Sequence, residues 1–332
     1  MERRTALVLG ASGGVGGEVA ARLALGDWRV RALHRDPDRI QRKLPVTWLK
    51  GDAMNAADVA AAAEGADLIV HAVNPPGYQN WHRLVLPMID NTIAAASAEG
   101  ARILLPGTIY NYGPEVFPEI SEDTPQAPHT RKGKIRVEME RRLQVVAKAG
   151  GARVLIVRAG DYFGPRAGNN WFAQALVKPG RRPRTIVTPG APGVGHQWAY
   201  LPDVAETMVR LVERADLADF ARFHMDGQWD SDGTRMAVAI RSVLGEPELP
   251  VKSLPWAPIR LAAPLVPLFR ELAEVRHLWQ APVRLRNDLL LATLGMEPRT
   301  PLTDAVRATL AGLGCLGQGP QSAGAATRQP AV

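Results

Sequence analysis

Cysteine is nearly absent from this chain of 332 residues, in which Cys315 is the only one. An intrachain disulfide is therefore excluded, and the single thiol is compatible with a reducing compartment. Long apolar runs are absent as well. The run before Gly10 is too short for a signal-peptide core, and Leu254–Phe269 is interrupted by Arg260 and prolines, short of the roughly 18 apolar residues of a spanning helix. These absences predict a cytoplasmic protein without membrane insertion.

An acidic excess is also missing, because 40 lysines and arginines outnumber 33 aspartates and glutamates and give a formal charge of +7. A basic balance favours anionic partners such as nucleotides. The excess is spread along the chain, and its one dense run, Lys178–Arg184, contains Pro179 and Pro183, which predict a solvated turn. In the absence of a nucleic-acid motif, we expect a small-molecule substrate and no nucleic acid. The sequence leaves open whether the protein forms a homodimer.

What the chain does contain is an alternation of short apolar runs with helical stretches. The apolar runs predict strands at Ala6–Leu9, Trp28–Leu33, Thr47–Lys50, Leu68–His71, Ile103–Leu105 and Val154–Val157. The stretches between them predict helices at Val15–Leu25, Ala56–Ala63, Trp81–Glu99 and Arg131–Lys148. Strands that alternate with helices form βαβ units. We therefore expect an α/β fold, a doubly wound parallel sheet of Rossmann type with its ligands at the carboxyl ends of the strands.

The pattern loosens after Pro165 and predicts a smaller C-terminal substrate lobe. We expect residues 1–165 to form a dinucleotide-binding domain to which 196–215 return, and 166–195 and 216–313 to form the lobe. Residues 314–332 offer little to bury and are expected to be a disordered tail.

One segment of this lobe, Leu254–Leu272, is rich in leucine, proline and alanine. This composition is typical of a wall or lid for an apolar substrate. A peripheral membrane contact is the alternative, which the prolines oppose because they interrupt a regular amphipathic helix.

A glycine-rich loop follows the first predicted strand and opens the first predicted helix. Its glycines are Gly10, Gly13 and Gly16, in the pattern G-x-x-G-x-x-G. Glycine permits a tight turn, a close backbone approach to a pyrophosphate and close helix packing, and the helix N-terminus offers N–H donors to phosphates. The loop predicts a dinucleotide site, in which Ser12 and Val15 also line the cofactor.

The end of the second predicted strand bears on the choice between NAD and NADP. In NAD sites an acidic residue about 20 residues after the glycine motif binds the ribose hydroxyls. Here the position holds His34, followed by Arg35. Arginine can pair with a 2′-phosphate, so Arg35 favours NADP, and NAD is the alternative if Asp36 binds the ribose instead. Asp52, after the third strand, would receive the adenine amino group or cap a helix.

Seven segments in order resemble the extended branch of the short-chain dehydrogenase/reductase superfamily, of NAD-dependent epimerase/dehydratase type, over residues 5–312. They are the glycine loop, Gly51–Ala53, His71–Val73, Pro106–Gly113, Arg158–Pro165, Trp198–Ala205 and Leu294–Leu302. The resemblance implies that Asp52, Ala53, Ala72, Val73 and Gly160 bind the cofactor together with the loop. It also implies a catalytic hydroxyl at Thr108.

The chain departs from this family's usual Tyr-x-x-x-Lys pair on the helix after the fifth strand. The matching segment is Thr130–Lys134, in which the lysine is present and Thr130 replaces the tyrosine. The resemblance implies that Lys134 holds the nicotinamide ribose, whereas a threonine hydroxyl is a poor proton donor. Tyr110, on the loop after the fifth strand, is the best substitute acid. The alternatives are Tyr162, His196 and a water chain.

These observations predict an NADP-dependent oxidoreductase or epimerase of the extended short-chain type, with hydride transfer between nicotinamide C4 and a small carbonyl or alcohol. Thr108, Tyr110 and Lys134 would be catalytic, and no metal is expected. In nucleotide-sugar members the position matching His196 usually carries an arginine for the substrate phosphates, so its absence argues against such a substrate. The alternative is a redox-inert NADP-binding sensor or scaffold, which the missing tyrosine favours.

Overall fold

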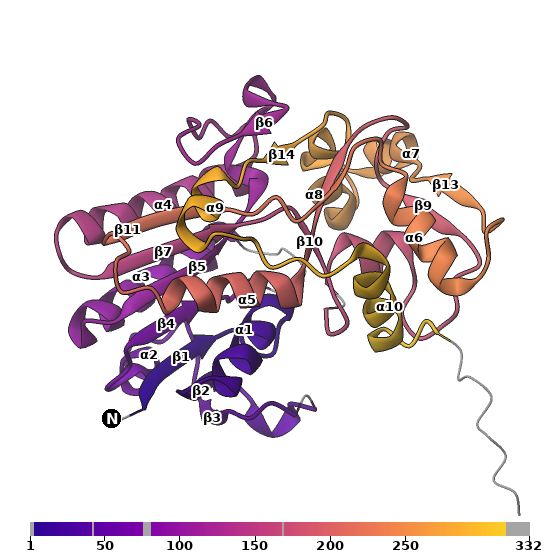
Figure 1. The fold of residues 1–332 in the computed structure, drawn as a ribbon. Helices are drawn as coiled ribbons and strands as arrows, with labels where there is room; N and C mark the ends of the chain where they lie inside the picture. Colours follow the sequence, from indigo (N-terminus) through magenta and orange to yellow (C-terminus); the bar gives the residue numbers. More distant parts are fainter. Residues whose placement is uncertain (1–2, 42, 76–80, 168, 317–332) are drawn as a thin grey trace, which may run out of the picture.

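A parallel sheet of seven strands forms the centre of the molecule (Figure 1). The computed structural model describes residues 3–41, 43–75, 81–167 and 169–316. The strands, in the order in which they lie side by side, are β11 (Phe220–His224), β7 (Arg153–Arg158), β5 (Arg102–Gly107), β4 (Leu68–His71), β1 (Arg4–Leu9), β2 (Trp28–His34) and β3 (Thr47–Lys50). All six pairings are parallel. The predicted doubly wound Rossmann-type fold is confirmed.

Helices cover both faces of this sheet, which explains why its strands are apolar throughout. Side chains alternate along β1, so that Ala6 and Val8 join one buried cluster and Leu7 and Leu9 the other. The first cluster packs on α1 (Gly14–Leu25) and α5 (Leu201–Val212), and the second on α2 (Ala56–Ala63), α3 (Trp81–Glu99) and α4 (Arg131–Lys148). The bounds predicted for α2, α3 and α4 are those observed.

The C-terminal lobe is built from short elements around its own core (Figure 1). Its sheets are β12 (Gln228–Asp230), β10 (His196–Tyr200) and β8 (Asp161–Phe163); β13 (Val251–Ser253) and β9 (Ile186–Thr188); and β14 (Arg284–Leu285) and β6 (Glu119–Ile120). Its helices are α6 (Arg235–Leu244), α7 (Trp256–Ala262), α8 (Pro267–Glu274) and α10 (Leu302–Gly312). Its short helical turns are η5 (Phe172–Leu176) and η6 (Arg276–Trp279). Earlier in the chain lie η1 (Pro37–Arg39), η3 (Ile109–Asn111) and η4 (Pro114–Val116).

The chain returns to the central sheet more often than the sequence pattern predicts. Residues 216–313 were expected in the lobe, but β11 pairs with β7 at the sheet edge. Helix α9 (Asp288–Leu294) follows it there, and its Leu290 is fully buried in the cluster beneath β11. A five-residue strand and a seven-residue helix carry too little periodic pattern to reveal which sheet they join.

The tail begins later than expected. Cys315 is fully buried in the lobe core, and its backbone N–H donates to the Leu310 carbonyl over 2.8 Å. Residues 314–316 therefore complete α10 and do not belong to a tail. Residues 317–332 lie outside the described part of the chain.

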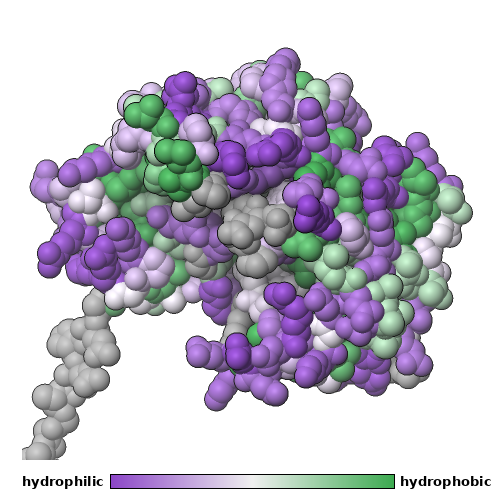
Figure 2. Space-filling model, turned by 180° about the vertical axis from the view of Figure 1, so that it is seen from behind, coloured by the Kyte–Doolittle hydropathy of each residue, from purple (hydrophilic) through white to green (hydrophobic). Residues whose placement is uncertain are grey.

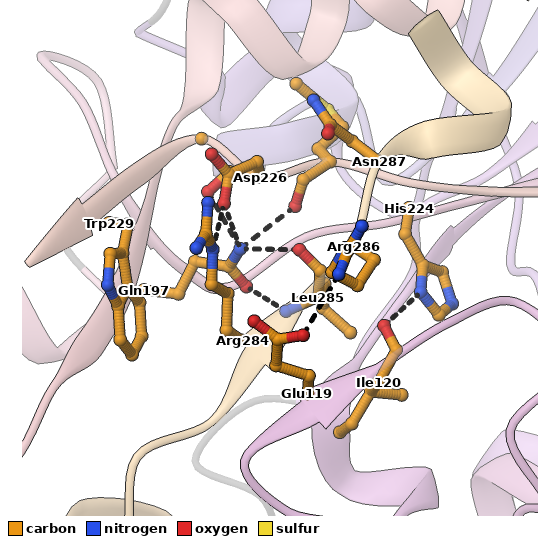
Figure 3. Close-up of polar contacts among 12 residues, drawn as sticks. Glu119, Ile120, Gln197, His224, Asp226, Trp229, Arg284, Leu285, Arg286 and Asn287 are labelled. Carbon is orange, nitrogen blue, oxygen red and sulfur yellow. Dashed lines mark hydrogen bonds and ion pairs between the residues drawn. The ribbon is translucent and has the colours of Figure 1, made fainter. Parts of the chain in front are cut away.

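A buried polar seam ties the lobe to the sheet (Figure 3). The Gln197 amide donates to the Leu285 carbonyl over 3.1 Å and accepts from its N–H over 3.0 Å, as a neighbouring strand would. The same amide donates to the Asp226 carbonyl over 2.8 Å, and the Asp226 carboxylate accepts from Arg284 over 2.8 Å. These bonds give hydrogen-bond partners to the backbone of β14, whose polar groups would otherwise be buried without partners.

Candidate active-site crevice

The glycine loop is held against the end of β4. Gly10 has a φ of +91°, and a Cβ on it would overlap the Ala72 carbonyl oxygen. A Cβ on Gly16 would overlap the Gly10 carbonyl oxygen. Because neither position tolerates a side chain, glycine here serves the packing of β1, α1 and β4. The Ala72 N–H donates to the Leu9 carbonyl over 2.9 Å and completes this joint.

Gly13 plays a different part in the loop. Its N–H donates to the Gly10 carbonyl over 3.0 Å, which closes the turn. A Cβ at Gly13 would meet only that carbonyl oxygen, at 3.3 Å, among the described residues within 4 Å. The exposed Ser12 and the half-buried Val15 flank it at the start of α1. This cradle at a helix N-terminus fits the pyrophosphate of a dinucleotide.

The two charged residues after β2 differ in their surroundings. Asp36 is paired with Arg39, whose Nε lies 2.9 Å from the carboxylate. Arg35 is exposed and makes no ion pair or hydrogen bond with the described residues. The neighbouring His34 lies edge-on to Trp48, with ring centroids 6.1 Å apart. Of the two residues weighed for the ribose end of the cofactor, only Arg35 is therefore without a competing partner in that part of the chain.

Asp52 has a local role in the structure. Its carboxylate accepts the Met54 N–H over 3.0 Å, and its own N–H donates to Asp58 over 2.8 Å. These bonds form a turn before α2, whose N-cap is Asn55, so Asp52 is not the helix cap considered for it. The next residue, Ala53, accepts a hydrogen bond from the Asn91 amide over 2.9 Å.

The carboxyl ends of β4, β5 and β7 meet at one edge of the sheet, as parallel strands require. Thr108 follows β5 there and is half-buried, and its hydroxyl donates to the Asn111 amide oxygen over 3.3 Å. The Tyr162 phenol donates to the Gly107 carbonyl over 3.2 Å. Burial raises the pKa of Tyr162 to about 12, so the phenol stays protonated at neutral pH.

The remaining predicted cofactor residues take separate positions. The half-buried Ala72 and Val73 follow β4 at this edge and belong to the crevice. Gly160 follows β7, and a Cβ on it would overlap the Gln197 carbonyl oxygen. The absence of a side chain at Gly160 thus lets the chain approach β10.

Helix α4 does not bring Lys134 to this crevice. Thr130 is its N-cap, and the Thr130 hydroxyl accepts the Gly133 N–H over 2.9 Å. Lys134 is exposed and lines a pocket of about 550 Å³ on the outer side of α4 with Glu138 and the His129–Glu115 pair. The match of Thr130–Lys134 to the Tyr-x-x-x-Lys pair depends on the lysine alone. At that position of α4 the side chain points away from the crevice.

Arg136, two residues later, is the α4 cation at the crevice. Its guanidinium lies 3.5 Å from the Asn74 side-chain oxygen and 5.0 Å from the Trp81 ring centroid. Burial and then the charge of Arg136 lower the pKa of His71, at the end of β4, to about 3. The sequence analysis did not single out Arg136. The signal that could have found it is its i, i+4 spacing from Lys132, which places both cations on one face of α4. In the structure Lys132 is 5% exposed, so this face is turned inward.

Buried ionic contacts link α4 to β7 and to the loop that carries Thr108. Arg158 is fully buried and donates to both carboxylate oxygens of Glu140 over 2.9 Å. It also donates to the Thr108 carbonyl. The Asn111 amide donates to Glu140 over 2.8 Å. This network holds the Thr108 loop against α4 with its charges paired, which a buried ion pair requires.

Tyr110 and His196 lie on different walls. The half-buried Tyr110 packs against a small apolar cluster that contains Ile109 and Tyr112. His196 is 2.9 Å from the Asp161 carboxylate and stacks on Trp279, with ring centroids 3.7 Å apart. His196 and Asp161 therefore form a polar pair against the aromatic core of the lobe.

No group of three potential metal ligands occurs among the described residues. Within the same residues, no helix is both long and apolar enough to cross a membrane.

The fold and the glycine cradle define a Rossmann-type protein suited to a dinucleotide. The family model described as "NAD dependent epimerase/dehydratase family" matches residues 6–221, well over half of the chain. The chain therefore belongs to this family of enzymes, as the seven segments implied.

The chain is also similar to one curated relative and to solved structures. The chain is 30% identical to the Sinorhizobium fredii protein y4nL over 199 residues, 53% of this chain, and spans 56% of that relative's length. UDP-glucuronic acid 4-epimerase from Bacillus cereus in complex with NAD has a TM-score of 0.73 at 16% identity, covering 93% of this chain and 98% of that one. The UDP-glucose 4-epimerase of Thermus thermophilus in complex with NAD has a TM-score of 0.70 at 18% identity, with 93% and 98% covered. At these identities the two structures share the fold alone.

Proposed function

We propose that the chain is an NADP-dependent oxidoreductase or epimerase that acts on a small carbonyl or alcohol. The observation that carries this proposal is the open Gly13 cradle at the start of α1, at the same edge of the sheet as Thr108 after β5, Tyr162 in β8 and Arg136 on α4. A bound nicotinamide dinucleotide supplies a hydride donor or acceptor at C4 of its ring.

The cofactor would be held by residues that follow five strands, β1, β2, β3, β4 and β7. We assign its phosphates to the loop and its adenosine and nicotinamide halves to the segments beside it. The assigned residues are Gly10, Ser12, Gly13, Val15, Gly16, Arg35, Asp52, Ala53, Ala72, Val73 and Gly160. In this list Gly10, Gly16 and Gly160 act by keeping the backbone close, since a side chain would overlap a carbonyl at each.

The chemical roles follow from hydrogen-bonding capacity and charge. The Thr108 hydroxyl can donate to a substrate oxygen, since it holds Asn111 only over 3.3 Å. Tyr110 remains the assigned proton donor. Arg136 takes the cationic role expected of Lys134, because its charge acts on His71 and Tyr162 at the strand ends.

The preference for NADP rests on Arg35. We expect NADPH to bind more tightly than NADH, because the exposed guanidinium can pair with the 2′-phosphate. Arg35→Ala should weaken NADPH binding by about 1–3 kcal/mol and leave NADH binding nearly unchanged. Fluorescence titration of both dinucleotides measures this. Arg3→Ala is the matched control, since Arg3 pairs with Asp27 at the opposite edge of the sheet. Equal affinities in the unchanged protein would refute the NADP assignment.

A panel of small carbonyl compounds tests the substrate class. NADPH oxidation in the presence of these aldehydes and ketones should reveal turnover. The role of Thr130 as a helix cap favours one competing function, a redox-inert NADP sensor, because its hydroxyl is already used by Gly133. Tight NADPH binding without turnover of any panel member would favour the sensor.

A further inference from the structure

Two short helices form an exposed apolar corner on the C-terminal lobe. Helices α7 and α8, with the turn 263–266 between them, present Leu261, Leu265 and Val266 to the outside, with exposed fractions of 84%, 86% and 37%. We call these three residues the α7–α8 corner. Figure 2 shows hydrophobic surface gathered at the upper left, where α7 and α8 lie. Exposed apolar side chains that gather at one place on a surface indicate an interaction site.

Helix α7 already packs against the lobe through its inward side, so the exposed residues of the corner are not the ones that attach the helix to the core. Ile259 is 6% exposed. The Trp256 indole N–H donates to the Pro189 carbonyl over 2.9 Å, and its ring lies 6.3 Å from that of Trp171. The outward leucines are additional to this packing.

The charged residues in the stretch of sequence that contains the corner are cations. From residue 249 to 270 the sequence contains Lys252, Arg260 and Arg270 and no acidic residue. All three cations are exposed. The carboxylates that follow turn inward, because Glu271 lies 2.5 Å from the Lys132 ammonium and Glu274 accepts the Arg131 N–H over 2.5 Å.

We propose that the α7–α8 corner docks on the surface of an anionic phospholipid bilayer. The leucines would enter the boundary between headgroups and acyl chains, while Arg260 and Arg270 meet the lipid phosphates. Apolar area and positive charge are the two contributions that peripheral membrane binding combines. The prolines that interrupt a long amphipathic helix instead create the turn on which Leu265 is exposed.

Vesicle sedimentation of the full chain tests this proposal. We expect binding to vesicles of phosphatidylcholine and phosphatidylglycerol in about a two-to-one ratio, and much weaker binding to phosphatidylcholine alone. The double variant Leu261→Ser, Leu265→Ser should reduce the partition coefficient about tenfold or more. Leu25→Ser is the matched control, because Leu25 is 75% exposed at the end of α1, away from the lobe. Arg260→Ala with Arg270→Ala should reduce both binding and its dependence on salt.

Three results would overturn the proposal. One is the absence of binding to the anionic vesicles. Another is an equal loss in Leu25→Ser and in the double leucine variant. The third is a lipid-free dimer, measured by analytical ultracentrifugation, that the double variant converts to a monomer, since the corner would then join two copies of the chain. Melting temperatures of the variants confirm that each is folded.

Discussion

The β1–α1 turn and the start of α4 border the same crevice, but different forces select the residues that face it. In the turn, Gly10 and Gly16 are required by backbone overlap within a few residues of chain. On α4, every fourth residue shares a face, and Lys134 and Arg136 are two of several cations available. Contacts with Asn74 and Trp81, distant in sequence, decide that Arg136 lies at the crevice. The comparison teaches that a local motif places its residues reliably only where the backbone itself leaves no choice.

The largest effect is expected in the glycine loop. Gly10→Ala combines a left-handed φ with overlap of the Ala72 carbonyl and should destabilise the fold by about 3 kcal/mol, as measured by urea denaturation. Gly13→Ala should change stability by less than about 1 kcal/mol but weaken NADPH binding about tenfold, because only the cradle is filled. Comparable losses of stability in both variants would remove the distinction between packing and binding glycines.

A smaller effect separates the two α4 cations. Arg136→Ala should lower NADPH affinity or NADPH-dependent turnover about 10- to 100-fold, because it removes the charge at the strand ends. Lys134→Ala should change either quantity less than about twofold, since its ammonium is exposed on the outer side of the helix. The opposite ranking would restore Lys134 as the crevice cation.

The pH dependence of folding tests the same electrostatics without a cofactor. The folded pKa of His71 is lowered to about 3, so between that value and the usual 6.5 the unfolded chain binds the additional proton. Stability should therefore fall as pH decreases below about 6.5, with a contribution approaching about 1.4 kcal/mol per pH unit. His71→Asn should remove this contribution to the slope, whereas replacement of the exposed His82 by glutamine should not. In Arg136→Ala the slope should end at a higher pH, because one cause of the lowered pKa is gone.

The smallest effect concerns the C-terminal end of α10, where local composition and tertiary burial again disagree. Truncation after Leu316 should leave the melting temperature unchanged. Truncation after Leu313 should reduce stability by about 1–2 kcal/mol, because it removes the buried Cys315 and its bond to Leu310. Identical melting temperatures for the two truncated chains would show that residues 314–316 contribute nothing.

The central sheet was predictable because the amino-acid composition of each strand indicates that both of its faces are buried. Leu7, Leu9, Ala6 and Val8 are apolar on both faces of β1, and a strand of this kind must lie between two layers of helices. The long helices α3 and α4 repeat their apolar pattern over several turns, so their ends could be read from the sequence. Family membership followed from the same local segments, each of which keeps its residues in order.

What the amino-acid order left undecided depends on contacts between distant segments. Whether Phe220–His224 joins the lobe or the sheet is decided by pairing with β7, and no periodicity in five residues encodes that partner. The burial of Cys315 depends on the lobe core around it, and the position of Arg136 depends on how α4 is rotated against α3 and β7. Local backbone sterics thus account for the glycine loop, whereas tertiary packing selects the charged side chains at the crevice, because a helix presents its residues to whichever surface buries its apolar face.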